Sequence, residues 1–567
     1  MRVRFTTYFE IDPSNKDKLL KKMNDEQYMQ KAEGNDRGNE IWQYELTSLP
    51  KVHLWFPAKG EGNPVTVIAL LSVGILLLVI SYVNFLNFSV AMAPVRARNI
   101  NIRKIFGESS FMLKMSVIME AVFLSFISFL LSIFLIRFLD TGALKDFFIA
   151  DLSITKNQGL LLFVGVVSIL SGFLAGIYPA FYTTAFNPAM ALSGAFSLSS
   201  RSKWLKNIST SVQFIAAIFL ITTTLFVQIQ YYYMRNKDWG IQTRNILYVN
   251  IEPIRDNVDN FMSKLKQNPN IVDITVSDIY PGQEHTQSWG RQYENVDINI
   301  NIWTVRPDFF NFFGVKFIKG ENFKENDYDK MILNNAFSKE YGFSEDMLNK
   351  DVSGFNVIGV VKDFNYKSVQ TGIKPLAFIL FPNSEYVKYY YKWVFVKTNG
   401  ANTKQTAKYI RDTWKKFSSE PVEVLSLTKT IQSLYQKEYN TASLVSICGI
   451  IAIVVAIIGL YGLILFDAKA KKKSIAIRRI HGALINEVVL ALNQSLLIRF
   501  AVSCLIAFPL SYYAVRRWLE QFAYKIPMYW WVFALGGLIV LVISLATVSW
   551  ESYKAASANP VDSIKAE

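Results

Sequence analysis

Long apolar runs alternate with polar segments along most of the chain. A helix needs about 20 apolar residues to cross the hydrocarbon core of a bilayer. Seven runs reach this length, at Val65–Met92, Met115–Leu139, Leu160–Tyr182, Ile208–Gln230, Ala442–Phe466, Val488–Val515 and Trp530–Trp550. The sixth run also carries Asn493, Gln494 and Arg499, so a buried helix of a soluble domain is an alternative there. The pattern as a whole predicts a polytopic α-helical membrane protein with about seven transmembrane helices.

The segment between the fourth and fifth runs has shorter apolar stretches at strand and helix spacing. Alternating or β-branched stretches predict strands at Asn245–Glu252, Ile271–Ser277 and Val357–Val361. Amphipathic stretches predict helices at Val258–Gln267 and Thr403–Phe417. This mixture predicts a water-exposed α+β domain built on βαβ-like units.

Aromatic residues are dense in one part of this domain, Tyr386–Trp393, which includes Tyr389, Tyr390 and Tyr391. A binding patch is one interpretation, and packing or an edge strand is the other. The second is preferred because aromatic side chains are common in strands in any case.

Composition and charge fit a chain divided between lipid and water. Of its 567 residues, 51% are hydrophobic and 19% are charged, with a formal net charge of +15 and a mean hydropathy of +0.20. The positive charges cluster in short segments beside the apolar runs, which argues for membrane orientation and against nucleic-acid binding. They are Arg96, Arg98, Arg103 and Lys104 after the first run, Arg201, Lys203 and Lys206 after the third, and Lys469, Lys471, Lys472, Lys473, Arg478 and Arg479 after the fifth.

Orientation follows from these loops, because basic loops stay on the cytoplasmic side. We expect a multi-pass protein of the cytoplasmic (inner) membrane, with residues 233–440 in the periplasm and the C-terminus in the cytoplasm. Glu120 lies just inside the second run near its cytoplasmic end, so we expect its side chain to reach the interface by snorkelling.

Sites for catalysis, cofactors or metals are not predicted. Cys448 and Cys504 are the two cysteines of the chain, and both lie in apolar runs. The three histidines are far apart in the sequence, so no zinc-ligand spacing exists. There is no G-x-x-x-x-G-K-[ST] phosphate loop, no G-x-S-x-G and no H-E-x-x-H. The sequence therefore predicts neither an enzyme nor a cofactor.

Two basic segments repeat the same pattern, basic-x-Ile-x-Ile-Arg-basic-Ile-x-Gly, at 98–107 and 473–482. A second repeated motif begins with Asn-Pro and follows each set of helices, at 187–192 and 559–564. Two motifs that repeat with similar spacing indicate an internal duplication. The isoleucines of each basic segment can present an apolar patch, and Gly107 suits a helix end or a sharp turn. A docking element is the preferred interpretation, and a plain membrane anchor is the alternative.

The two basic segments resemble the E-I-G-I-R-K-x-x-G signature of FtsX/MacB-type ABC transporter permeases. The two Asn-Pro motifs resemble the NPxxxL sequence that ends the transmembrane domains of this family. The stretches at 308–315, 333–337, 357–364 and 374–376 resemble its MacB-like periplasmic domain. The variant with two FtsX-like halves, typical of Bacteroidota, is the most similar. Asn99 and Asn101 depart from the family's Glu and Gly in the first segment.

The resemblance implies a division of the chain into five parts. Residues 1–62 would be the remnant of a first extracytoplasmic domain, and 63–195 a first FtsX-like transmembrane domain of three helices. Residues 196–232 would be the first helix of the second half, 233–440 the MacB-like periplasmic α+β domain, and 441–567 a second transmembrane domain of three helices. Residues 1–62 would lie outside although no signal peptide or spanning run precedes them. We therefore expect the chain to be truncated at its N-terminus or to start from an internal Met.

The family further implies a permease subunit whose partner on the cytoplasmic face is a separate ABC ATPase. ATP hydrolysis there would move the extracytoplasmic domain, for export or efflux or for mechanotransmission, and a periplasmic or outer-membrane partner is left open. The alternative is a membrane sensor that regulates a cell-envelope enzyme without transporting a substrate. The residues expected to contact the ATPase are Arg98, Ile100, Ile102, Arg103, Lys104, Gly107, Asn187, Pro188, Lys473, Ile475, Ile477, Arg478, Arg479, Gly482, Asn559 and Pro560.

Overall fold

The fold of the chain is described by a computed structural model. It describes residues 10–25, 46, 48, 64–141, 153–185, 200–283, 287–293, 296–342, 347–352, 354–380, 390–470, 481 and 484–557. The chain forms two compact units, Met1–Ser72 and Val73–Glu567. In the first unit, the short turn η1 (Pro13–Asn15) leads into helix α1 (Lys16–Met23), which has no buried residue.

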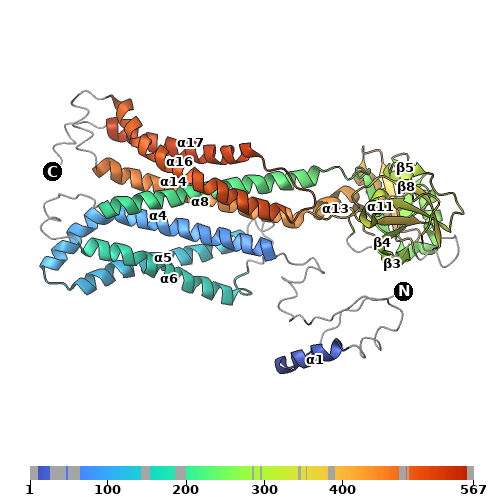
Figure 1. The fold of residues 1–567 in the computed structure, drawn as a ribbon, viewed down its shortest axis with the longest axis horizontal. Coiled ribbons are helices and arrows are strands. Elements are labelled where there is room, and N and C mark those ends of the chain that lie inside the picture. Colours follow the sequence, from blue (N-terminus) through green and yellow to red (C-terminus); the bar gives the residue numbers. More distant parts are fainter. Residues whose placement is uncertain are drawn as a thin grey trace. The chain divides into compact units, whose positions relative to one another are not determined.

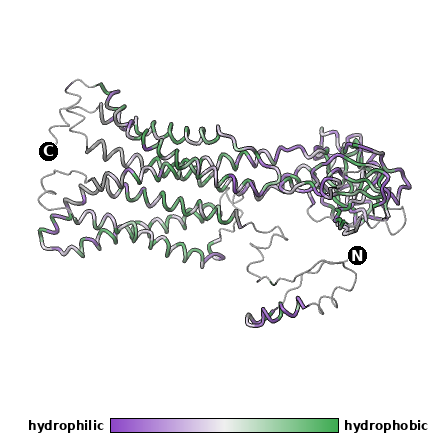
Figure 2. Tube along the Cα trace, viewed as in Figure 1, coloured by the Kyte–Doolittle hydropathy of each residue, from purple (hydrophilic) through white to green (hydrophobic). Residues whose placement is uncertain are grey.

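Seven of the described helices are long and apolar enough to cross a membrane (Figures 1 and 2). They are α4 (Pro64–Ile105), α5 (Ser110–Thr141), α6 (Gln158–Thr184), α8 (Ser200–Asn236), α14 (Gln436–Ala470), α16 (Ile485–Leu519) and α17 (Trp530–Ser557). The predicted polytopic architecture is confirmed. The sixth run belongs to it as well, because α16 exposes large apolar side chains such as Leu505, which is 76% exposed and would not lie so in a soluble core.

Exposed tryptophans lie at the two ends of the apolar stretch of the last helix. Trp530 is 79% exposed and Trp550 is 73% exposed. At the rise of an α-helix the two lie about 30 Å apart, which is the thickness of the hydrocarbon core. Tryptophan is enriched at both membrane interfaces, so these two residues place α17 across the bilayer.

Small and polar residues hold the membrane helices together. Helix α8 packs against α14, α16 and α17, and the amide of Gln228 donates to the Ser446 hydroxyl of α14 at 2.7 Å. Helices α5 and α6 pack along each other, where a Cβ on Gly172 would come within 2.6 Å of the Ser125 Cβ. Close contacts at small residues and hydrogen bonds between helices are the usual means of association in lipid.

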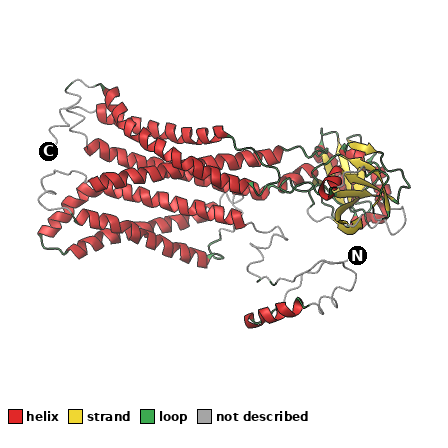
Figure 3. Ribbon diagram, viewed as in Figure 1, coloured by secondary structure: helices red, strands yellow, loops and turns green. Residues whose placement is uncertain are grey.

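The strands that the structure describes all belong to the α/β domain (Figure 3). The smaller sheet has four strands in the order β11 (Leu425–Ser426), β1 (Ile246–Asn250), β10 (Trp393–Thr398) and β2 (Ile271–Ser277). Because β10 runs antiparallel to both β1 and β2, those two strands are parallel, and α9 (Val258–Leu265) connects them. This is a split βαβ unit. Phe261 of α9 stacks edge-on against Trp414 of α12 (Thr403–Trp414) in its core.

The larger sheet has seven described strands. Its order is β3 (Gln287–Tyr293), β4 (Val296–Thr304), β9 (Leu376–Ile379), β6 (Lys330–Asn334), β8 (Phe355–Val361) and β5 (Phe317–Gly320), with β7 (Asp351–Val352) paired to β8. Helices α10 (Phe309–Phe313), α11 (Asn335–Tyr341) and α13 (Leu427–Ser433) complete the domain. Its core is aromatic: the buried Trp303 lies edge-on to Phe309 and Phe378.

The predicted strands and helices of this domain are confirmed, with ends that differ by a few residues. At Trp393 the structure favours packing over an edge strand, because Trp393 begins β10, which has a partner strand on each side. Its ring lies 5.4 Å from that of Tyr248 and 5.0 Å from that of Tyr280. Packing therefore explains Trp393, whereas Tyr389 lies outside the described residues.

Candidate functional site

The first basic segment, Arg98–Gly107, is helical where the sequence predicted a loop. Helix α4 runs to Ile105, so every predicted contact residue of this segment except Gly107 lies in its last turns. Cations near a helix C-terminus are stabilised by the helix dipole, which favours this continuation. Gly107 has a φ of 91°, a left-handed conformation that glycine adopts without strain, and it ends the helix as predicted.

The isoleucines of this segment do not share one face. Ile100 is 6% exposed and packs with Leu113 of α5. Ile102 is 38% exposed, Ile105 is 58% exposed and Phe106 is 86% exposed. Residues two apart on an α-helix point about 200° apart, so Ile100 and Ile102 cannot form one patch. The predicted patch is corrected to Ile102, Ile105 and Phe106, which we call the α4–α5 turn surface.

Two ion pairs fix the geometry of this turn. Arg103 binds Glu108 through two hydrogen bonds, Nε to Oε2 at 2.6 Å and Nη2 to Oε1 at 2.5 Å. A two-point arginine–carboxylate pair is directional and holds the backbone between its members. Further into the membrane, Arg96 of α4 pairs with Glu120 of α5 at 2.7 Å. Glu120 therefore has an arginine partner on the neighbouring helix, which its position in the sequence did not predict.

The other predicted contact residues remain predictions. Arg98 is described for its backbone alone. The remaining ones lie outside the described residues: Asn187, Pro188, Lys473, Ile475, Ile477, Arg478, Arg479, Gly482, Asn559 and Pro560.

A second candidate site lies where the α/β domain meets the membrane helices. The loop Asp363–Pro375, called the junction loop here, connects β8 to β9. Its first contact is with the segment leaving α8, because the N–H of Asn365 donates to the C=O of Trp239 at 2.8 Å. Its second contact is with the residue before α14: the N–H of Val369 donates to the Tyr435 hydroxyl at 3.2 Å.

Gln370 makes two further contacts from the middle of the junction loop. Its side-chain amide donates to the Glu438 carboxylate in the first turn of α14. Its C=O accepts the N–H of Ala523, in the loop between α16 and α17, at 2.9 Å. One loop of the α/β domain thus contacts the segments at the ends of α8, α14 and α16.

Gln230 of α8 holds the loop between α16 and α17 in place. The side chain is fully buried. Its Nε2 donates to the C=O of Tyr524 at 2.9 Å, and its Oε1 accepts the N–H of Ile526 at 3.0 Å. Both ends of a buried amide are therefore satisfied by the backbone of one loop, which fixes the position of that loop against α8.

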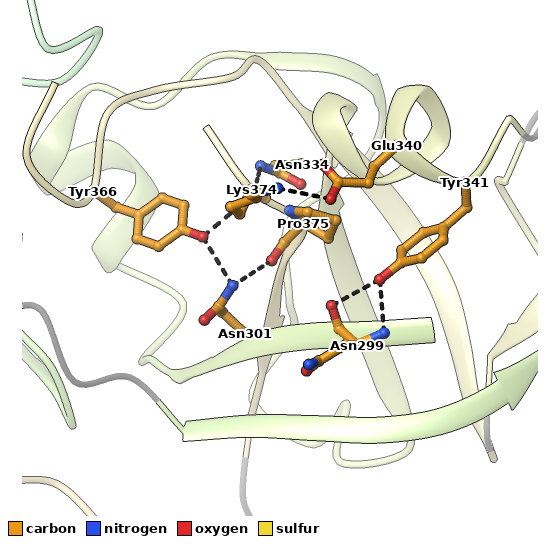
Figure 4. Close-up of polar contacts among 8 residues, drawn as sticks. All are labelled: Asn299, Asn301, Asn334, Glu340, Tyr341, Tyr366, Lys374 and Pro375. Carbon is orange, nitrogen blue, oxygen red and sulfur yellow. Dashed lines mark hydrogen bonds and ion pairs between the residues drawn. The ribbon is translucent and has the colours of Figure 1, made fainter. Parts of the chain in front are cut away.

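Two asparagines attach the far end of the junction loop to the larger sheet (Figure 4). Asn334 of β6 donates from Nδ2 to the C=O of Lys374 at 3.0 Å and accepts the N–H of Leu376 at 3.0 Å, as a neighbouring strand would. Asn301 of β4 donates from Nδ2 to the C=O of Pro375 at 3.0 Å. The chain is therefore fixed where it enters the central strand β9.

Two more contacts in Figure 4 reinforce this attachment. Lys374 pairs with Glu340 of α11 at 2.9 Å. The Tyr366 hydroxyl donates to the C=O of Lys374 at 3.4 Å. Burial raises the pKa of Tyr366 far above its ordinary value, so the hydroxyl keeps the proton that it donates.

Candidate metal ligands do not cluster in the part of the chain that the structure describes. Within those residues no three His, Cys, Asp or Glu side chains lie close enough to hold an ion. The arrangement at the junction consists of hydrogen bonds and packing.

Part of the membrane region is similar to a known protein family. The model of the FtsX-like permease C-terminal family matches residues 446–560. This segment is similar to the C-terminal domain of FtsX-like permeases. It comprises most of α14, together with α16 and α17, and it confirms the sequence resemblance for this part of the chain.

Solved structures also show similarities to part of this chain. One is the extracellular domain of the noncanonic ABC-type transporter YknZ from Gram-positive bacteria, 18% identical over 30% of this chain and 88% of that one, with a TM-score of 0.23. Another is a permease-protein domain from Porphyromonas gingivalis, 12% identical over 32% of this chain and 88% of that one, with a TM-score of 0.24. Comparison with the curated proteins gives no match.

Proposed function

We propose that the chain is the permease subunit of an ABC transporter, driven by a separate ATPase subunit on the cytoplasmic face. ATP hydrolysis moves the cytoplasmic ends of the membrane helices, and the α/β domain responds on the other side. The FtsX-like permease domain at 446–560 supports the class of protein. The basic residues at the ends of α4, α8 and α14 support the orientation, because such residues stay in the cytoplasm.

The observation that carries the proposal is the attachment of the α/β domain to the membrane helices. The two chain ends of the domain continue into α8 and α14. The junction loop in its middle contacts Tyr435, Glu438 and Ala523. A domain fixed at several points follows a relative shift of those helices, because packed interfaces transmit small displacements.

The α4–α5 turn surface and the repeated basic segment at 473–482 are the proposed contacts with the ATPase. Apolar side chains exposed beside cations suit a protein groove with an acidic rim. The residues at 187–192 and 559–564 complete this proposed surface. In the same proposal the membrane part comprises 63–195, 196–232 and 441–567, and residues 233–440 are extracytoplasmic.

Co-purification tests the proposal. The tagged full chain, isolated from its host in mild detergent, should carry an ATPase whose activity elutes with it. Charge reversal at Arg478 and Arg479 should remove that activity from the eluate while leaving the amount of permease unchanged. If the variant keeps the ATPase, the docking surface is wrongly assigned, and if the wild type elutes without ATPase activity, the proposed function fails.

Export and regulation are separated by a second assay. Deletion of the gene should reduce efflux of peptides or drugs if the subunit exports. Unchanged efflux together with altered cell-wall turnover would contradict export and support a regulator of an envelope enzyme.

A further inference from the structure

A buried carboxyl group lies where the two sheets of the α/β domain meet. Asp278 directly follows β2 of the smaller sheet and is 3% exposed. The preceding Ser277 forms an isolated antiparallel bridge with Val305, which directly follows β4 of the larger sheet. This short bridge joins the two sheets through their backbones.

Asp278 strengthens the bridge with its backbone and its side chain. Its N–H donates to the C=O of Thr304 at 3.1 Å, and its Oδ1 accepts the N–H of Thr304 at 2.9 Å. The Ser277 hydroxyl also donates to Oδ1, at 3.4 Å. The second oxygen, Oδ2, is buried without a hydrogen-bond partner in the described structure. A neutral carboxyl tolerates this position better than an ionised one, since an uncompensated buried charge is costly.

The groups around Asp278 do not neutralise it. Lys392 precedes β10 and attracts the ionised form, but it acts only through space. The Tyr391 hydroxyl donates to the C=O of Val305 at 3.5 Å instead. Beyond β4, Arg306 pairs with Asp259 at 2.9 Å, and Asp308 accepts a hydrogen bond from Thr275 at 2.6 Å. Burial raises the pKa of Asp278 to about 7, against the opposing effects of its hydrogen bonds and of Lys392.

We propose that Asp278 is a proton-dependent lock between the two sheets. The protonated side chain holds Thr304 and keeps the bridge closed. Loss of the proton places an uncompensated charge at the contact between the two sheets, which we call the seam. The seam then opens more often. The α/β domain therefore becomes less rigid as the pH of its compartment rises. This inference concerns the domain alone and stands whether or not an ATPase drives the chain.

The direction and size of the effect follow from linkage. In the open seam the carboxyl returns to an ordinary pKa of about 3.9. The closed seam binds the proton more tightly than the open seam. The proton therefore stabilises the closed seam fully below about pH 4, and this stabilisation is lost as the pH rises through about 7. Between about pH 6 and about pH 8 the opening equilibrium should rise about tenfold.

Hydrogen exchange of the full chain in nanodiscs tests the lock. Exchange is measured over this pH range and corrected for the intrinsic pH dependence of amide exchange. Amides of β2 and of the end of β4 should lose about tenfold in protection, and those of β6 should not. Asp278→Asn keeps the acceptor for Thr304 but cannot ionise, so it should remove the pH dependence. The control Asp308→Asn, at a half-buried acid that accepts a hydrogen bond from Thr275 of β2 but does not contact the bridge, should retain it.

Two results overturn the proposal. One is equal pH dependence of β2 and β6 in the wild type, a comparison that holds even if Asp278→Asn fails to fold. The other is a folded Asp278→Asn variant whose β2 and β4 amides keep the wild-type pH dependence.

Discussion

The backbone N–H of Ala523 donates to the C=O of Gln370 at 2.9 Å, which joins the loop between the last two membrane helices to the middle of the α/β domain. These residues are far apart in the sequence and belong to different parts of the molecule. Their contact completes a set in which the junction loop contacts the segments at the ends of α8, α14 and α16. Under the proposed function, movement of any of these helices would act directly on the loop that leads into the central strand β9.

Gln230 should be essential for the position of the loop between α16 and α17. Replacement by leucine leaves the C=O of Tyr524 and the N–H of Ile526 without partners, at a cost of about 1–3 kcal/mol for each buried group. We expect faster hydrogen exchange over 520–529 and a lower unfolding temperature. Gln228→Leu, which loses a bond to α14, should lower the unfolding temperature but leave exchange of this loop unchanged. Unchanged exchange in Gln230→Leu would show that the loop is held by other contacts.

The attachment of the junction loop to the larger sheet should depend on Asn334. Asn334→Asp keeps the acceptor for the N–H of Leu376 but replaces the donor to Lys374 with an oxygen. We expect a loss of about 1–3 kcal/mol in the free energy of unfolding, measured by chemical denaturation of the full chain. Asn299→Ala is the control, because Tyr341 contacts only the backbone of Asn299 (Figure 4). Equal losses in the two variants would contradict the role of the Asn334 amide.

Much of this fold was predictable from hydrophobic length and periodicity. Seven apolar runs became seven membrane helices, and the strands at β1, β2 and β8 followed from alternation or β-branching. The ends of the helices were not predictable in the same way. The basic residues that were predicted to form loops instead continue α4 and begin α8, because charge marks the side of a membrane but does not end a helix.

The contacts of the junction loop could not be predicted from the sequence, for a different reason. Asn334, Gln370 and Ala523 are ordinary residues whose importance comes from tertiary contacts between distant segments. Gln230 did carry a signal, since an amide at the end of an apolar run must find a partner within the protein. The resemblance of residues 374–376 to the MacB-like domain drew attention to the end of the junction loop. It did not predict which residues contact that end.

Close packing of α5 on α6 should not tolerate a side chain at Gly172. A Cβ there would lie 2.6 Å from the Ser125 Cβ and 3.1 Å from the C=O of Ala121. Gly172→Ala should separate the two helices and destabilise the protein by about 1–3 kcal/mol, seen as a lower unfolding temperature in detergent. Gly74→Ala is the matched control, because a Cβ at that position meets nothing within 4 Å. A wild-type unfolding temperature for Gly172→Ala would contradict the packing described here.

Phe106 should contribute to ATPase binding and not to folding. Its side chain is 86% exposed, so Phe106→Ala removes little buried surface. We expect an unchanged unfolding temperature, together with loss of most of the ATPase that co-purifies with the chain. Leu162→Ala, at a 74% exposed position near the start of α6, should keep the ATPase. Full retention by Phe106→Ala would remove this residue from the proposed contact surface.

Hydrogen exchange of the complex with its ATPase, with and without a non-hydrolysable ATP analogue, tests the transmission of movement most directly. If nucleotide binding moves the helices that hold the α/β domain, the analogue should change exchange in the junction loop and in residues 520–529. Exchange in β6, which lies inside the larger sheet, should stay the same. A complex that binds the analogue at its ATPase but leaves exchange at the junction loop unchanged would contradict the account.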